Sequence, residues 1–226
     1  MRAILSLLIT LSLLLSGASS LVLAKKTDQR PNFLLIVADD LGWSDLGSFG
    51  SEIKTPNLDA LADAGVKFTD FHVSVSCSPT RSMLMTGTDN HIAGLGTMSE
   101  LLTDELRIKP GYEGYLNDRV VTLAEVLRDG GYHTYMSGKW HLGEEPEHFP
   151  TARGFAKSFS MLYGGASYWS DMTGVVAGVQ EVAKYVKDDQ ELKSLPEDFY
   201  ATRNYTDILM NMIRDNRGDD KPFFAY

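Results

Sequence analysis

The sequence predicts an α/β fold in which a mainly parallel sheet is flanked by helices. Apolar runs with strand character alternate along the chain with segments that carry helix start and stop signals. Each of the first three predicted strands also leads into a cluster of polar residues. Because ligand sites in open α/β sheets gather at the carboxyl ends of the strands, the same order predicts where a site lies.

The first predicted strand is the continuous apolar run 33–38, which ends at Asp39 and Asp40. A run without polar alternation is typical of a strand buried on both faces. A helix is predicted between Pro56 and Gly65, because proline is favoured at the first helical position and glycine just past the end.

The second predicted strand is Val66 to Val73, where apolar and polar residues roughly alternate. It delivers the chain to Cys77, and a short helix is predicted from Pro79 to Leu84. A polar cluster that contains the only cysteine therefore follows this strand.

The third predicted strand, Tyr132 to Met136, follows a helix over 123–128 that has a capping box at its start and a glycine pair at its end. It leads to Lys139 and His141. Three polar clusters are therefore expected at one edge of the sheet.

The last predicted elements are an amphipathic helix over 202–214 and an apolar segment over 223–226 that resembles the start of a further buried strand. A natural terminus usually fades into polar residues. We therefore expect the molecule to be truncated here and to continue beyond Tyr226.

The first 24 residues read as a secretory signal peptide, because Arg2 precedes an apolar stretch from Leu5 to Leu15 and a group of small residues. The apolar stretch is shorter than the roughly 20 residues that span a bilayer, which argues against a stable membrane span. A periplasmic or secreted protein is expected. Its formal net charge of −9 argues against nucleic acid as a partner.

A single cysteine is unusual in an exported protein, because disulfides come in pairs. Cys77 is therefore an inert buried thiol, an intermolecular link or a residue kept for chemistry. Its place before Pro79 at a helix start favours anions, and Arg81 adds a permanent charge that can hydrogen-bond two oxygens.

The other two clusters suggest a metal ion and an anion. Asp39 and Asp40 are adjacent like charges at a strand end, which a hard divalent cation would compensate, although paired aspartates are also common in turns. Lys139 and His141 lie on the same side of an extended segment and can contact one anion together. The stretch around Tyr163 is aromatic and lines an aryl pocket or belongs to the packing.

The chain resembles the sulfatase family of the alkaline phosphatase superfamily, most closely the bacterial arylsulfatases. The resemblance covers nearly the whole chain after residue 24 and depends on a specific Cys-x-Pro-x-Arg core. Thr88 departs from the arginine common in the extended family signature, and Met85 replaces the usual leucine. The segments that carry the resemblance are Pro31 to Gly42, Thr55 to Asp59, Cys77 to Gly87 and Gly138 to Gly143.

The resemblance implies a sulfuric ester hydrolase of alkaline-phosphatase/sulfatase-like fold, with residues 25–226 as the N-terminal part of its catalytic domain. A formylglycine-generating enzyme would oxidise Cys77 to formylglycine, whose hydrated aldehyde attacks the sulfate ester substrate. Asp39, Asp40 and position 77 would bind Ca²⁺, with Mg²⁺ less favoured. Arg81 and Lys139 would stabilise charge, and His141 would help the reaction to turn over.

Three alternatives stay open at this stage. A phosphonate or phosphate ester hydrolase of the same superfamily would use the same site on a phosphorus centre. A cysteine hydrolase would use the thiol of Cys77 itself, although no family-specific cysteine signature is present. A truncated, non-catalytic fragment is the third, because family members take further metal ligands, a lysine and a histidine from their later half. We expect the isolated chain to be poorly active.

Overall fold

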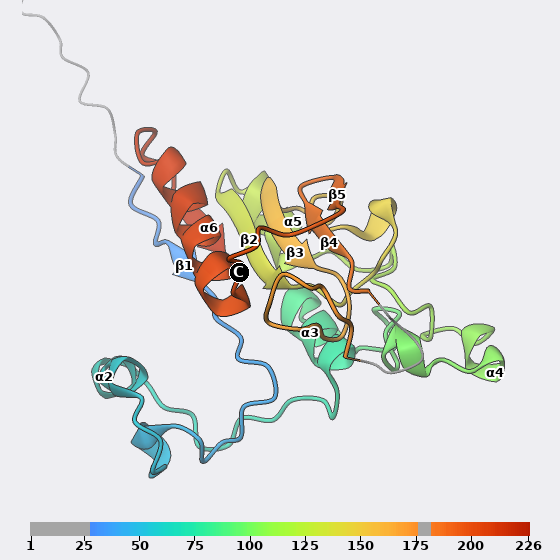
Figure 1. Ribbon diagram of the computed structural model, residues 1–226, viewed down its shortest axis with the longest axis horizontal. Coiled ribbons are helices and arrows are strands. Elements are labelled where there is room, and N and C mark those ends of the chain that lie inside the picture. Colours follow the sequence, from blue (N-terminus) through green and yellow to red (C-terminus); the bar gives the residue numbers. More distant parts are fainter. Residues whose placement is uncertain (1–27, 176–181) are drawn as a thin grey trace, which may run out of the picture.

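The computed structural model describes residues 28–175 and 182–226. The predicted signal peptide lies outside the described residues. The centre of the molecule is a six-stranded sheet in the order β1-β6-β2-β3-β4-β5, with helices packed on it (Figure 1). The elements in chain order are β1 (Phe33–Leu34), the 3-10 helix η1 (Gly47–Phe49), α2 (Pro56–Ala64), α3 (Cys77–Thr86), η2 (Ser99–Leu101), α4 (Asp104–Arg107), α5 (Leu123–Asp129), β2 (His133–Lys139), η3 (Pro146–His148), β3 (Lys157–Met161), β4 (Tyr185–Lys187), β5 (Gln190–Leu192), α6 (Ala201–Asp215) and β6 (Phe223–Ala225).

The sheet is mainly parallel, which confirms the predicted fold class. Strands β1, β6, β2 and β3 run in parallel, whereas β4 and β5 are added antiparallel at one edge. The strand β6, from the end of the chain, lies between β1 and β2 and pairs with both. Because these strands are parallel, the segments that follow β1 and β2 leave the sheet side by side, at the carboxyl ends of the strands.

Two hydrophobic cores cover the two faces of the sheet. Successive residues of a strand point to opposite faces, so Tyr135 packs in the core that contains α6, and Met136 packs in the core that contains α3 and α5. In β6 the same alternation separates Phe224 from Ala225. The result is a sheet with α6 on one face and α5 on the other, and α3 extends the second core beyond the ends of the strands.

The helix predictions are confirmed, and the last apolar segment does form a strand. The capping box at Thr122 is present, since its hydroxyl accepts from the backbone N–H of Glu125 and the Glu125 carboxylate accepts from the backbone N–H of Thr122. The helix around Pro79 begins two residues earlier than predicted, at Cys77. Strands β3, β4 and β5 were not predicted.

The prediction of a first strand buried on both faces is wrong. Only Phe33 and Leu34 are paired as a strand, and both are exposed. Leu35 and Val37 pack against the core, whereas Ile36 is 70% exposed. The run forms the outermost strand of the sheet, so it has a neighbouring strand on one side only. Only one of its faces packs against the core, and the residues of the other face are therefore exposed.

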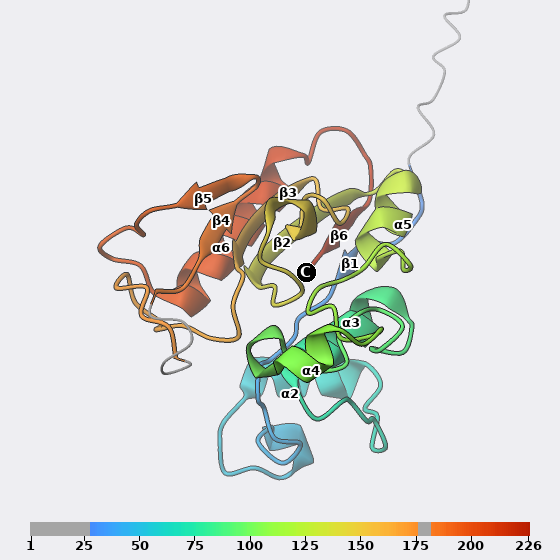
Figure 2. The same cartoon turned by 90° about the vertical axis from the view of Figure 1, so that its right-hand side faces the viewer.

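The prediction of a second strand at Val66 to Val73 is also wrong. The segment has no regular secondary structure, and Phe68 and Phe71 are each 70% exposed. It belongs to a part of the chain, together with α2, that lies apart from the sheet (Figures 1 and 2). A strand needs a partner for its backbone hydrogen bonds, and no described strand lies beside this segment.

Among the described residues, no helix has both the length and the apolar character that crossing a bilayer requires.

Candidate active site

The predicted site residues meet at the edge of the sheet where β1 and β2 end. Asp39 follows β1, Lys139 is the last residue of β2, and Cys77 is the first residue of α3. In both ribbon views α3 lies beyond the end of the sheet and faces these two segments (Figures 1 and 2). The structure brings all six predicted residues, including Asp40, Arg81 and His141, into one cluster.

Asp39 joins the two cations of the cluster. Its carboxylate accepts a hydrogen bond of 3.0 Å from Arg81 Nη2 and another of 2.8 Å from Lys139 Nζ. Burial raises the pKa of Asp39, but the hydrogen bonds and charges of Lys139 and Arg81 outweigh burial, and the pKa lies below its usual range. The carboxylate therefore stays ionised and fixes both cations.

Arg81 is held in place on three sides. Besides the bond to Asp39, its Nη1 donates 2.8 Å bonds to the backbone oxygen of Lys139 and to the hydroxyl of Tyr226. Only 5% of its side chain is exposed. A guanidinium provides several donors in one rigid plane, so Arg81 ties α3, β2 and the end of β6 into one unit.

Cys77 lies half-buried at the first position of α3. Backbone N–H groups in the first turn of a helix have no intrahelical partner, and the dipole favours negative charge there. A hydrogen bond with His141 lowers the pKa of the Cys77 thiol; burial opposes this effect, and Lys139 adds to it. Position 77 is therefore suited to carry an anionic oxygen or sulfur.

Position 77 and the two aspartates also form a candidate metal site. One ligand atom from each of Asp39, Asp40 and Cys77 lies within 4.8 Å of the other two. Asp40 has a φ of 55°, a left-handed conformation that aspartate tolerates better than most residues. Carboxylate oxygens suit a hard cation such as Ca²⁺ or Mg²⁺, and each Asp39 oxygen has a second lone pair beside the one that accepts from Arg81 or Lys139. The donor set therefore fits the implied ion.

His141 has a buried partner that the sequence did not reveal. Its Nε2 lies 3.0 Å from Oε2 of Glu100, and 3% and 2% of the two side chains are exposed. Burial lowers the pKa of His141, but the bonds to Cys77 and Glu100 outweigh burial and raise the pKa. Glu100 lies in a polar stretch without a recognisable motif, and only the folded chain brings it across 41 positions to His141.

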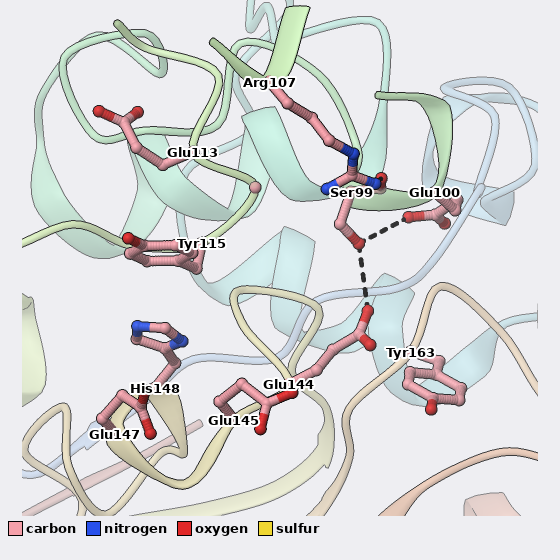
Figure 3. A pocket seen from close by; sticks show the side chains of 11 residues that line it. Ser99, Glu100, Arg107, Glu113, Tyr115, Glu144, Glu145, Glu147, His148 and Tyr163 are labelled. Carbon is pink, nitrogen blue, oxygen red and sulfur yellow. Dashed lines mark hydrogen bonds between the residues drawn. The ribbon is translucent and has the colours of Figure 1, made fainter. Parts of the chain in front are cut away.

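A cavity of about 580 Å³ opens beside Glu100, the partner of His141 (Figure 3). Glu100 forms part of its wall, and the Ser99 hydroxyl lies within hydrogen-bonding distance of both Glu100 and Glu144. Tyr163, from the predicted aromatic stretch, lines the cavity, whereas Trp169 is exposed and packs against Tyr200. The cavity therefore lies next to the candidate catalytic residues, because the Glu100 carboxylate both lines the cavity and bonds His141.

Comparisons with known proteins agree on one family. The sulfatase family model matches residues 31–226. An uncharacterised sulfatase of Schizosaccharomyces pombe is 48% identical over 206 residues, which is 88% of this chain and 37% of the relative. An arylsulfatase of Klebsiella aerogenes is 40% identical over 94% of this chain and 46% of the relative. The chain spans less than half the length of these two curated relatives.

Solved structures show the same fold. The crystal structure of a protein named Ps i-CgsB superposes with a TM-score of 0.71 at 30% identity, over 88% of this chain and 44% of that one. The likeness supports the fold and the arrangement of the sheet around the site.

Proposed function

The chain belongs to the sulfatase family, and from this we propose that its protein is a sulfuric ester hydrolase of the arylsulfatase type. The observation that carries the proposal is the setting of Cys77. The residue lies at a helix start, contacts His141 and Lys139, and faces a pair of aspartates suited to a metal ion. A nucleophile, two fixed cations and a divalent ion together suit attack on an anionic ester.

The proposed nucleophile is formylglycine made from Cys77 by a formylglycine-generating enzyme. In this form position 77 supplies a hydrated aldehyde oxygen, and a Ca²⁺ ion at Asp39 and Asp40 supplies Lewis acidity and charge neutralisation. The half-buried thiol lies among groups that stabilise negative charge. This setting supports a role in chemistry rather than an inert thiol.

The chain's own residues would bind the sulfate group and move a proton. The Lys139 ammonium is held beside position 77 by Asp39, so it is positioned to donate to a sulfate oxygen. Arg81 donates hydrogen bonds to the backbone oxygen of Lys139 and to the carboxylate of Asp39, and so fixes both residues. His141 contacts position 77 and is suited to take a proton from that group and return it.

We further propose that the protein acts outside the cytoplasm, in the periplasm or after secretion. The support is the signal peptide that the sequence predicts at residues 1–24 and the lone cysteine, for which the proposed modification gives a reason. Residues 25–226 would form the N-terminal part of the catalytic domain.

A substrate comparison tests the reaction class. We expect the protein encoded by the longest natural reading frame that contains this chain to cleave an aryl sulfate with a kcat/KM about 10- to 100-fold above that for the matching aryl methylphosphonate. Replacing one oxygen by a methyl group leaves one charged donor, such as Lys139, without its acceptor, and such a hydrogen bond contributes about 1.5–3 kcal/mol. Both rates are measured by release of the same phenol.

The comparison has a built-in control, because the leaving group is identical in the two esters. Equal or faster cleavage of the phosphonate would assign the protein to the phosphonate hydrolases of the superfamily. Cleavage of neither ester would contradict the proposed function altogether.

A further inference from the structure

We propose that Glu100 is the positioning residue of His141, holding the imidazole against position 77 during turnover. The inference rests on the proposed function, because it assigns a role within the same site. It goes beyond the motif residues, since Glu100 lies inside the region matched by the family model but outside the four short motifs that carry the resemblance. Three observations on the described residues carry it.

The first observation is the contact itself. A carboxylate and an imidazole lie 3.0 Å apart, and almost none of either side chain is exposed. Removing two ionisable groups from water is costly unless they compensate one another. The burial of Glu100 raises its pKa, and the bond to His141 outweighs this effect and lowers it, so Glu100 is an ionised acceptor.

The second observation is that the orientation of the ring depends on this bond. The other ring nitrogen, Nδ1, is buried and has no oxygen or nitrogen partner among the described residues, so besides its interaction with the Cys77 thiol the ring is held by the hydrogen bond to Glu100. The backbone of His141 has a φ of 57°, which is uncommon for a residue with a side chain, and its N–H donates to the oxygen of Leu162 at 3.2 Å. The backbone is therefore fixed by the fold, whereas the imidazole is fixed through Nε2 by Glu100.

The third observation is the close packing around the pair. The Ser99 hydroxyl donates to Oε2 of Glu100 at 3.2 Å. On another side, a Cβ atom at Gly164 would lie 2.5 Å from Glu100 Oε1 and 2.9 Å from His141 Cε1. Glu100 and His141 therefore occupy space that a side chain at residue 164 would need. Glu100 and His141 are held as a unit.

The role follows from the geometry. A histidine that transfers a proton at position 77 must keep its ring in one orientation, because small displacements from the reactive geometry slow such steps. Glu100 does not contact position 77 in any described interaction and acts through His141. Losing it should therefore reduce kcat and leave substrate binding nearly unchanged.

The test uses the protein from the longest natural reading frame, with an aryl sulfate as substrate. We expect Glu100→Ala to lower kcat about 10- to 100-fold, the range typical of a partner that orients a functional histidine, with KM changed by less than about threefold. Glu100→Gln keeps an oxygen that accepts from Nε2 and should recover most of the lost kcat. Mass spectrometry of the peptide containing residue 77 must show the same modification in every variant.

Glu144 provides a matched control. It is a half-buried carboxylate in the wall of the same cavity, and its Oε1 lies 3.1 Å from the hydroxyl of the same serine, Ser99, but it makes no described hydrogen bond to His141. Glu144→Gln should retain the kcat of the wild-type protein. Gly164→Ala is a second variant that leaves both ionisable groups present, and its Cβ should displace the pair and also lower kcat about tenfold.

The outcomes separate the two proposals. An inactive wild-type protein would contradict the proposed function. If the wild-type protein is active, any of three results would overturn the role of Glu100. The kcat of Glu100→Ala could lie within twofold of the wild-type value, or Glu144→Gln could lose as much kcat as Glu100→Ala. The third such result is a kcat in Glu100→Gln as low as that of Glu100→Ala. Should Glu100→Ala fail to fold, undiminished kcat in Glu100→Gln together with undiminished kcat in Gly164→Ala would overturn it.

Discussion

Replacement of Cys77 by alanine is expected to abolish the hydrolysis of sulfate esters, with kcat lowered by on the order of 10⁴-fold or more. Alanine removes the only atom from which a nucleophile at this position can be made. The surrounding groups stay, because Asp39 bonds Arg81 and Lys139 rather than Cys77. The measurement is kcat with an aryl sulfate in the full-length protein, together with the mass of the peptide that contains residue 77.

The neighbouring Ser78 offers a matched control for this variant. It lies in the same first turn of α3, is buried, and its hydroxyl has no hydrogen-bond partner among the described residues. Ser78→Ala should therefore keep kcat within a few fold of the wild-type value. Substantial turnover by Cys77→Ala would rule out a nucleophile at position 77. An unmodified thiol in fully active protein would instead favour a cysteine hydrolase.

The site could be predicted from the sequence to the extent that its residues belong to local motifs. Cys77 and Arg81 are separated by one turn of a helix, and Lys139 and His141 by two positions, so each pair is visible as a short pattern. The expectation that strand ends meet at one edge then brings the pairs together, as the structure shows. No short pattern contains both His141 and Glu100, because the contact between them depends on how the chain returns through η2.

The limits of the fold prediction have a similar cause. Hydrophobic periodicity reports whether a segment has apolar faces, but not whether another strand lies beside it. The run 33–38 has one strand neighbour, β6, which comes from the other end of the described chain, and Val66 to Val73 has none. The helix over 123–128 was predicted well because its capping box lies within four residues.

Replacement of Asp39 by asparagine is expected to lower kcat/KM by on the order of 10³-fold and to weaken Ca²⁺ binding at least about tenfold. Asparagine keeps an oxygen but loses the charge that holds Lys139 beside position 77 and compensates the buried Arg81. The measurements are kcat/KM across a calcium titration and the free energy of unfolding. Because Asp39 is 43% exposed, the loss of stability should be only about 1 kcal/mol.

Chelation separates the two roles of Asp39. A chelator removes the metal ion from the wild-type protein but leaves the carboxylate on Arg81 and Lys139, so activity should fall and return when Ca²⁺ is added. In Asp39→Asn excess Ca²⁺ should restore only part of the activity, because the ion cannot replace the hydrogen bond to Lys139 Nζ. Asp129→Asn, at an exposed helix end, serves as the charge-matched control.

The comparison also decides which role of Asp39 dominates. If saturating Ca²⁺ returned Asp39→Asn to the wild-type kcat/KM, the carboxylate would act through the metal alone, and its bonds to Arg81 and Lys139 would be dispensable. If chelation left the wild-type protein fully active, the aspartate pair would not be a functional metal site. The hydrogen bonds from Asp39 to both cations lead us to expect neither result, because under the proposed function one carboxylate would hold the metal ion and position Lys139 at the same time.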